Sequence, residues 1–303
     1  MLSTMTINEI LDSFEKYDGV YKRQEVDAAI ALQDEITPQL INVLKDVLVD
    51  PEKYADEENN YFGHIYAFML LGYFREVEAH DVIVGLFSLP GKLSGDLFGD
   101  CVTGNLPIVL LNTCGGDLTR IKELVLNQDA DEYCRGSAIE SVMYGVIEGI
   151  ISREDVLSYY SDLFAEYEKA GESSLTATLA CCVCDLYPEE LMPVIDKAYD
   201  VGIVDSTYIS REEFDEALAK GKNKCLQELY VKFDRIHSLS VHDSMSWWAS
   251  FDQDKKAGNI LSTSSTENRS KLNLASTGHV AKKIKSKNKI AKKSRKANRK
   301  KRK

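Results

Sequence analysis

The sequence predicts an all-α protein, built as a HEAT-like helical-repeat solenoid and followed by a disordered basic C-terminal tail. Three observations support this prediction. Apolar residues recur with the period of an α-helix, similar pairs of segments follow one another along the chain, and the last residues are mostly Lys and Arg. No segment alternates polar and apolar residues for long enough to predict a strand.

The helical period is clearest in four segments, each of which is predicted to form a helix with one apolar face. Their apolar residues are Ile7, Ile10, Leu11, Phe14 and Tyr17; Leu40, Ile41, Leu44, Val47 and Leu48; Val156, Tyr160, Leu163, Phe164 and Tyr167; and Leu191, Met192, Ile195, Ala198 and Tyr199. The capping-box pair Thr6 and Glu9 predicts a helix start, and Pro38 after Thr37 predicts another.

The most apolar stretch of the chain is residues 61–74. It is too short to cross a membrane, because a spanning helix needs about 20 mostly apolar residues. We therefore expect a buried helix of a soluble protein.

Repeated segments indicate stacked helical hairpins. The segments that begin at His64 and Cys134 can be superposed, with Ala67 on Ala138. Their offset corresponds to about two repeats of about 40 residues, the length of a HEAT unit. A third unit is expected one repeat later, at residues 174–199.

Charge is strongly segregated along the chain. All 48 acidic residues lie at or before Glu267, together with 21 of the 37 basic residues, so this part carries about 27 negative charges and the remainder 16 positive ones. We expect a helical-repeat domain at 1–252, a flexible polar linker at 253–279 and a disordered polybasic tail at 280–303.

The tail is predicted to bind nucleic acid, a ribosome or another polyanion, because each cation that neutralises a phosphate releases counterions and needs no folded pocket. It contains no aromatic residue, so recognition by base stacking is not expected and binding should be nonspecific and salt-dependent. The predicted polyanion-binding residues are Lys282, Lys283, Lys285, Lys287, Lys289, Lys292, Lys293, Arg295, Lys296, Arg299, Lys300, Lys301, Arg302 and Lys303.

Two other roles for the tail stay open: an intramolecular autoinhibitory arm that contacts the acidic domain, and a targeting signal. A membrane-surface role is less favoured, because Lys-rich charge without an acyl chain or apolar face anchors weakly. The seven scattered Cys and the lack of a charged-then-apolar leader predict free thiols and a cytoplasmic location.

The sequence contains no recognisable catalytic, phosphate-binding or metal-binding motif, and no catalytic residue, cofactor or metal ligand is assigned. Cys181, Cys182 and Cys184 have spacings that do not suit zinc, and we expect them to be buried as small apolar residues. An enzyme of unknown chemistry with a site near His64 is kept as the alternative, since this imidazole lies in the apolar stretch. Trp247, Trp248 and Phe251 are expected to hold the last helix on the domain, and acidic runs such as residues 50–58 to form a solvated face.

Seven short motifs follow one another along the chain in an order that resembles the bacterial domain-of-unknown-function 1186 family. The resemblance extends over residues 5–252. The motifs are TINEILDSF (6–14), HIYAFMLLGYFRE (64–76), LFSLPG (86–91), CGGDL (114–118), YCRGSAIES (133–141), DLYPEEL (185–191) and MSWWASF (245–251). The resemblance implies a helical-repeat fold and a bacterial origin, and it assigns no activity. Members of this family often continue into a small Cys-rich zinc module, but this chain has no Cys after Cys225.

The function that we expect is that of a non-enzymatic scaffold or adaptor. Its helical-repeat domain would bind a protein partner of unknown identity, because helical-repeat proteins present extended binding surfaces. Its basic tail would bind the polyanion.

Overall fold

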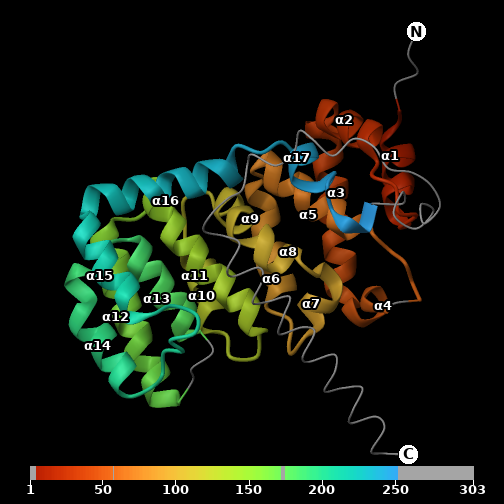
Figure 1. The fold of residues 1–303 in the computed structure, drawn as a ribbon. Coiled ribbons are helices and arrows are strands. Elements are labelled where there is room, and N and C mark those ends of the chain that lie inside the picture. Colours follow the sequence, from red (N-terminus) through yellow and green to blue (C-terminus); the bar gives the residue numbers. More distant parts are fainter. Residues whose placement is uncertain (1–4, 57, 172–174, 252–303) are drawn as a thin grey trace, which may run out of the picture. The chain divides into compact units, whose positions relative to one another are not determined.

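The computed structural model describes residues 5–56, 58–171 and 175–251, and within these ranges the protein is all-helical (Figure 1). The β-type pairings among these residues are two isolated bridges, Lys16 with Tyr61 and Pro90 with Ala130. The predicted fold class is therefore confirmed as all-α. The predicted linker (253–279) and the predicted polybasic tail (280–303) lie outside the described residues.

The helices follow one another with short connections. In chain order they are α1 (Ile7–Glu15), α2 (Arg23–Ala31), α3 (Gln33–Val49), α4 (Pro51–Ala55), α5 (Gly63–Phe74), η1 (Val77–Ala79), α6 (His80–Phe87), α7 (Leu93–Phe98), α8 (Cys101–Gly104), α9 (Leu106–Thr113), α10 (Thr119–Leu126), α11 (Glu132–Ile147), α12 (Arg153–Ala170), α13 (Thr176–Asp185), η2 (Glu189–Leu191), α14 (Met192–Asp200), α15 (Arg211–Lys220), α16 (Lys222–His237), α17 (Val241–Met245) and η3 (Ala249–Phe251).

The four segments with helical period lie on α1, α3, α12 and α14, as predicted. The capping box at the start of α1 is formed: the Thr6 hydroxyl accepts from the Glu9 amide at 3.3 Å, and the Glu9 carboxylate accepts from the Thr6 amide at 2.8 Å. These two bonds satisfy amides that the first helical turn leaves without a partner.

The prediction of a helix start at Pro38 is wrong, because α3 already begins at Gln33 and continues through Pro38. The chain leaves α2 at Leu32, whose amide donates to the carbonyl groups of Ala28 and Ala29. Pro38 lies in the second turn of α3, where its missing N–H removes one helical hydrogen bond. The helix continues past Pro38 to Val49, and several of its apolar side chains are buried in the core.

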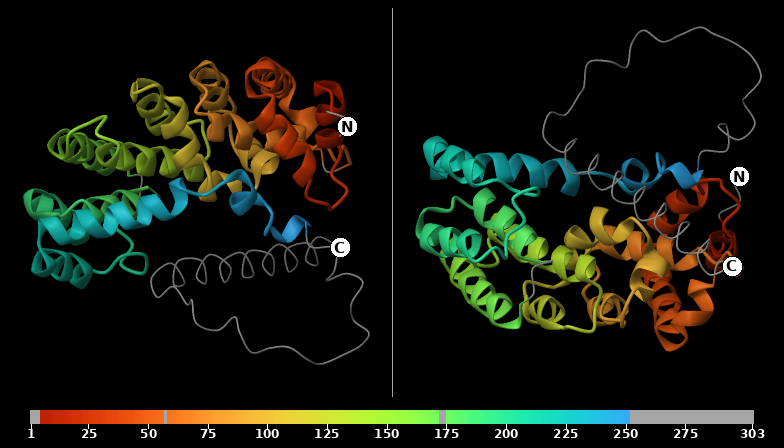
Figure 2. Two further views of the ribbon diagram at one scale, coloured as in Figure 1. Left: turned by 90° about the horizontal axis from the view of Figure 1, so that it is seen from above. Right: turned by 60° about the horizontal axis from the view of Figure 1, so that its bottom comes forward.

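The core is organised around helices that pack side by side in chain order. α5 packs on α3 and α9, α11 packs on α9 and α13, and α15 follows against α13. The helices α6 and α10 pack on each other and on members of this row, and α12 packs on α11, α13 and α14 (Figure 2). The first two predicted repeat units lie on α5–α6 and α11–α12, and the third lies on α13–α14, so each unit consists of consecutive helices.

The apolar stretch 61–74 forms α5, which lies in the centre of the core with every residue from Gly63 to Gly72 buried. Among the described helices, none is both long enough and apolar enough to cross a bilayer. The position of α5 explains its composition: it is covered by α1, α3, α9 and α17, so it has no polar face.

After α15 the chain returns across the row. α16 packs on α11, α13 and α15, and α17 packs on α5, so that residues 222–251 lead from the C-terminal helices back to the N-terminal ones (Figure 1). We call residues 222–251 the C-terminal strap. This segment brings side chains from distant parts of the sequence into contact, and it defines the candidate site.

Candidate functional site

The predicted polyanion-binding residues, Lys282 to Lys303, lie outside the described residues, so their role stays a prediction. The polar groups that the structure does bring together lie along the C-terminal strap. Polar contacts hold the strap on the helices beneath it at several places along its length.

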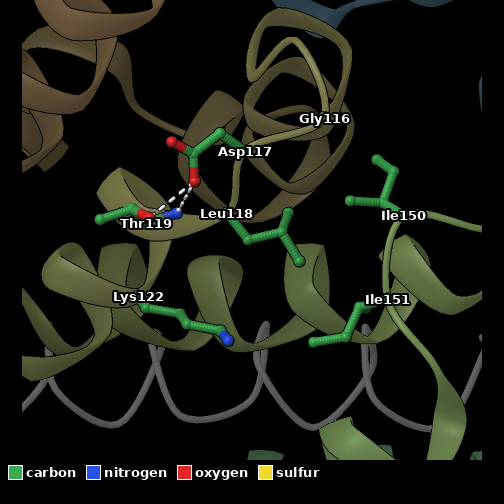
Figure 3. Close-up of a pocket in the computed structure, with 7 residues that line it drawn as sticks. All are labelled: Gly116, Asp117, Leu118, Thr119, Lys122, Ile150 and Ile151. Atoms are coloured by element: carbon green, nitrogen blue, oxygen red, sulfur yellow. Dashed lines mark hydrogen bonds between the residues drawn. The ribbon is translucent and has the colours of Figure 1, made fainter.

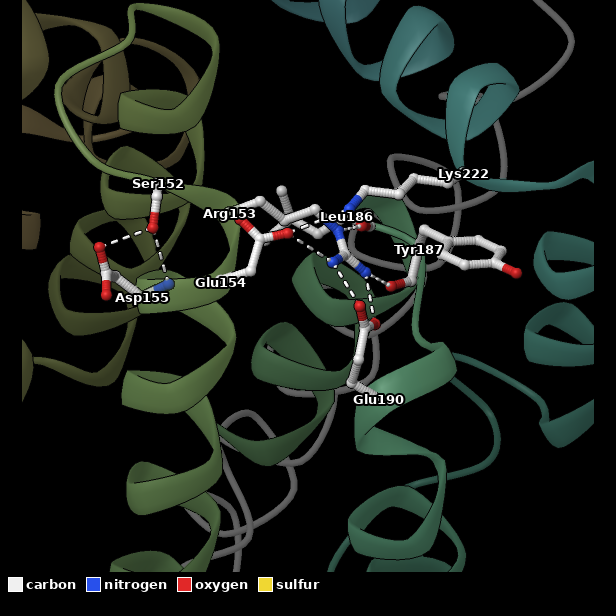
Figure 4. A network of polar contacts seen from close by, with 8 residues as sticks. All are labelled: Ser152, Arg153, Glu154, Asp155, Leu186, Tyr187, Glu190 and Lys222. Atoms are coloured by element: carbon white, nitrogen blue, oxygen red, sulfur yellow. Dashed lines mark hydrogen bonds and ion pairs between the residues drawn. The ribbon is translucent and has the colours of Figure 1, made fainter.

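The first group lies beside the start of the strap, around Arg153 (Figure 4). The Arg153 guanidinium is buried and donates through Nε to the Leu186 carbonyl at 2.6 Å. It also forms a two-pronged ion pair with Glu190, at 2.7 Å from Nη1 and 2.6 Å from Nη2. Lys222 of the strap pairs with Glu154 at 3.0 Å.

This network is a structural junction. Arg153 begins α12, Leu186 follows the end of α13 and Glu190 lies in η2, so the guanidinium joins the start of α12 to the connection between α13 and α14. The hydrogen bonds from Arg153 lower the pKa of the Glu190 carboxyl. Glu190 is exposed to solvent, and it also holds the Arg153 guanidinium.

The second group lies at the middle of the strap. Lys232 pairs with Asp185 of α13 at 2.8 Å. Glu140 of α11 is a second carboxyl group that interacts electrostatically with Lys232. Burial raises the pKa of Glu140. Burial lowers the pKa of Lys232, but Asp185 and Tyr144 outweigh this effect and raise it overall. The lysine therefore stays charged and fixes α16 over α11 and α13.

The third group lies at the end of the strap and joins α17 to α2 and to the segment that precedes it. His242 contacts the Tyr21 hydroxyl through Nδ1 at 2.8 Å and Asp27 through Nε2 at 2.8 Å. The Asp27 carboxylate accepts the Nε2 proton, so Nδ1 accepts the proton of Tyr21. This is the order of groups that activates a nucleophile in hydrolases. However, burial raises the pKa of Tyr21 to about 12, so the phenol stays protonated and the arrangement acts as a clasp.

Aromatic residues complete this clasp. Phe251 packs against Tyr21, Phe62 and Tyr66 with ring centroids 5.3 to 6.4 Å apart. Trp248 is half-buried and stacks on Phe251. The prediction that these residues hold the last helix is therefore confirmed for Trp248 and Phe251 and wrong for Trp247, whose exposed fraction is 74%.

His64, the centre of the alternative enzyme site, is packed between aromatic rings. Its Nε2 donates to the Leu97 carbonyl at 2.8 Å, its ring stacks on Tyr61, and Phe98 meets it edge-on. Its Nδ1 is buried without a hydrogen-bond partner. Burial lowers the pKa of His64 to about 4. A neutral imidazole bound to a backbone carbonyl stabilises the core, and the geometry gives it no carboxylate partner among the described residues.

The cysteine cluster on α13 is only partly buried as predicted. Cys182 is buried, whereas Cys181 and Cys184 are half-buried at the surface of the helix. All three thiols are free, and burial raises the pKa of Cys181 to about 12. Within residues 5–56, 58–171 and 175–251, no three His, Cys, Asp or Glu side chains lie close enough together to hold a metal ion.

A shallow pocket of ≈ 200 Å³ opens at the start of α10, in the CGGDL motif (Figure 3). Its apolar wall is Leu118, Ile150 and Ile151. The Asp117 carboxylate in this pocket already accepts from the Thr119 amide at 2.9 Å and from its hydroxyl at 2.6 Å. Both bonds belong to the helix start, so the Asp117 carboxylate is already used by the fold.

The contacts of the strap were not predicted from the sequence. His242 and Asp27 are 215 residues apart in the sequence, and Tyr21 and His242 are 221 apart. A local pattern contains no information about such a pairing. The one indirect signal was the aromatic motif MSWWASF, which places a packing surface at the end of the strap.

Comparisons with known proteins agree with the resemblance found in the sequence. The family model described as a protein of unknown function, DUF1186, matches residues 5–252. An uncharacterised protein of Chlamydia trachomatis serovar D is 30% identical over 249 residues, which are 82% of this chain and 98% of that protein. An uncharacterised protein of Chlamydia muridarum is 30% identical over 248 residues, again 82% of this chain and 98% of that protein. No solved structure matches.

Proposed function

Since the chain belongs to the family of proteins of unknown function DUF1186, whose description names no activity, we propose from its own residues that it is a non-enzymatic adaptor. Its helical body binds a protein partner, and its basic tail binds a polyanion such as RNA, DNA or a ribosome. The observation that carries the proposal is the segregation of charge, with 14 Lys and Arg among residues 280–303 and all acidic residues before residue 268.

The family model ends at residue 252, before the linker and the tail. The relatives described above are covered almost completely by the match, which leaves 18% of this chain without a counterpart in them. We therefore propose that the family body, residues 1–252, carries the function shared with the relatives. The linker at 253–279 and the tail at 280–303 add attachment to a polyanion.

We further propose that the body is a HEAT-like stack of repeats. This is supported by side chains that donate to the backbone of a neighbouring hairpin about one repeat away. Asn112 donates to the Gly72 carbonyl across 40 residues, Asn127 to Ser88 across 39 and Arg153 to Leu186 across 33. Such ladders connect each repeat to its neighbour, which is how helical repeats form one continuous core.

The strap limits where a protein partner can bind. α16 already covers part of α11 and α13, and α17 covers part of α5. The partner surface that we propose therefore lies on helix faces that the strap leaves open. No residue is assigned a catalytic role, and the location proposed for the protein is cytoplasmic, because its seven Cys include no disulfide among the described residues.

The proposal is tested by measuring the binding of the full-length protein to generic RNA and duplex DNA over a series of salt concentrations. We expect log affinity to fall linearly with log salt, by about a thousandfold between about 50 and 200 mM for six or more phosphate contacts. The first variant has the 14 cations of residues 280–303 replaced by Gln, and it should bind neither nucleic acid.

A second variant, with the residues of the tail shuffled at constant composition, is the matched control. Its affinity should equal that of the natural sequence, because counterion release does not depend on residue order. Failure of the natural protein to bind at physiological salt, or equal binding by the Gln variant, would contradict the proposal.

A further inference from the structure

The last residue of α16, His237, lies where three other helices meet. Arg75 ends α5, Asn112 belongs to α9, and Glu148 follows α11. The His237 ring stacks on Phe233 of its own helix, with ring centroids 4.6 Å apart. Because this ring contacts side chains 125 and 162 residues away in the sequence, it is a point where the strap is attached to the body.

One ring nitrogen of His237 faces two groups that require it in opposite protonation states. Nε2 contacts Nη2 of Arg75, and it lies 3.2 Å from Oδ1 of Asn112. A guanidinium only donates, so it needs a lone pair on Nε2; an amide oxygen only accepts, so it needs a proton there. The amide group of Asn112 cannot be turned around to remove this conflict, because its Nδ2 donates to the Gly72 carbonyl at 3.0 Å.

The charges around the ring come from three elements. On α5, Arg75 opposes a charge on His237; at the end of α11, Glu148 favours it and also pairs with Arg75 at 3.6 Å; on α16, Asp234 favours it. The contribution of α9 is the uncharged Asn112. Burial, followed by Arg75, lowers the pKa of His237, and Glu148 and Asp234 oppose the shift without cancelling it.

We propose that His237 is a proton-operated switch that changes partner between Arg75 and Asn112 and thereby sets how firmly the strap is held on α5. The neutral ring accepts from Arg75 and ties the strap to the end of α5. The protonated ring donates to Asn112 and repels Arg75, which keeps Glu148 as its partner. The inference concerns the body and its strap, so it holds or fails independently of polyanion binding by the tail.

The sign of the pH effect follows from the lowered pKa. A histidine whose folded-state pKa lies below its ordinary value of 6.5 stabilises the folded arrangement above that value, and this stabilisation is lost as pH falls through the folded-state pKa. The strap is therefore held firmly at neutral pH and loosened in acid.

The test is hydrogen exchange of the full-length protein at about pH 7.5 and about pH 5.5, with rates corrected for the intrinsic pH dependence of exchange. A lost hydrogen bond to a charged group predicts that protection at the end of α16 and in residues 238–245 falls about tenfold in acid. In His237→Gln the response should disappear, because the Gln amide oxygen accepts from Arg75 and its NH₂ donates to Asn112 at every pH.

His242→Gln is the matched control on the same strap, and it should keep the acid response at His237. A second readout is the NMR signal of the Arg75 side chain, which should titrate with the His237 ring in the natural protein and stay constant in His237→Gln. Equal protection at both pH values in the natural protein, or an unchanged acid response in His237→Gln, would overturn the proposal.

Discussion

At the scale of single residues, the clearest physical consequence concerns His64. Its imidazole is 3% exposed, donates to the Leu97 carbonyl and leaves Nδ1 without a partner. A charged ring at this position would have no counterion among the groups it contacts, which is why burial lowers its pKa to about 4. The residue therefore makes the stability of the fold depend on pH.

We predict that the free energy of unfolding falls by about 3 kcal/mol as pH falls from 6.5 to about 4, because the unfolded chain binds the proton that buried His64 does not. In His64→Gln this part of the pH dependence should be missing, since the amide donates to Leu97 and does not titrate. Urea unfolding at a series of pH values measures both effects.

His64→Leu separates titration from hydrogen bonding. It should be less stable than the natural protein at pH 7, because the Leu97 carbonyl loses its donor, but it should show the same flattened pH dependence as His64→Gln. A slope unchanged in both variants would show that other groups cause the acid sensitivity.

At the scale of helices, the crossing of α5 and α9 depends on the absence of a side chain at Gly72. A Cβ atom at Gly72 would lie 2.6 Å from a methyl carbon of Val109, closer than nonbonded carbons approach. The Gly72 carbonyl also accepts from Asn112 of α9. At this crossing, the backbone of α5 at Gly72 therefore lies against side chains of α9.

We predict that Gly72→Ala destabilises the protein by about 1 to 3 kcal/mol, because the crossing has no room for the methyl group. Gly95→Ala is the matched control: it also lies within a helix, α7, and a Cβ there meets no atom within 4 Å. It should stabilise the protein by up to about 1 kcal/mol, the difference in helix propensity. Urea unfolding compares the two.

The double variant Gly72→Ala with Val109→Ala identifies the cause. Because Val109 supplies the methyl groups that the new Cβ meets, the double variant should lose less free energy than the sum of the two single variants. Strict additivity would locate the effect of Gly72→Ala elsewhere.

At the scale of the whole molecule, the body and the tail carry net charges of opposite sign. The first 267 residues carry about 27 negative charges and the remaining residues 16 positive ones. A tethered segment is present at a high effective concentration, in the millimolar range for short flexible tethers. The autoinhibitory role considered for the tail would follow from this attraction, and it would compete with the binding of an external polyanion.

We predict that the hydrodynamic radius of the full-length protein is smaller at low salt than at high salt, because salt screens the attraction between tail and body. The variant with the tail cations replaced by Gln should have the same radius at both salt concentrations. Analytical ultracentrifugation or dynamic light scattering measures the difference, and a radius independent of salt in the natural protein would argue against the autoinhibitory role.

The sequence by itself determined the helical class and the position of several helices. The apolar period located α1, α3, α12 and α14, and the length and apolar composition of 61–74 predicted the buried helix α5. These features were readable because helix formation and the apolar face of a helix depend on residues within a few turns of one another. The start of α3 was misplaced, because its packing in the core overrides the local signal of Pro38.

Only the tertiary structure decided which distant residues meet. Tyr21 and Asp27 contact His242, Arg75 contacts His237, and Gly72 lies against Val109 because α5, α9, α16 and α17 pack at particular positions along one another. Those positions are set by the fit of many side chains across the whole core, so they cannot be predicted from any short segment of the sequence. The charge of the tail, in contrast, is read directly from the sequence, because it depends only on the number of Lys and Arg residues and not on how they fold.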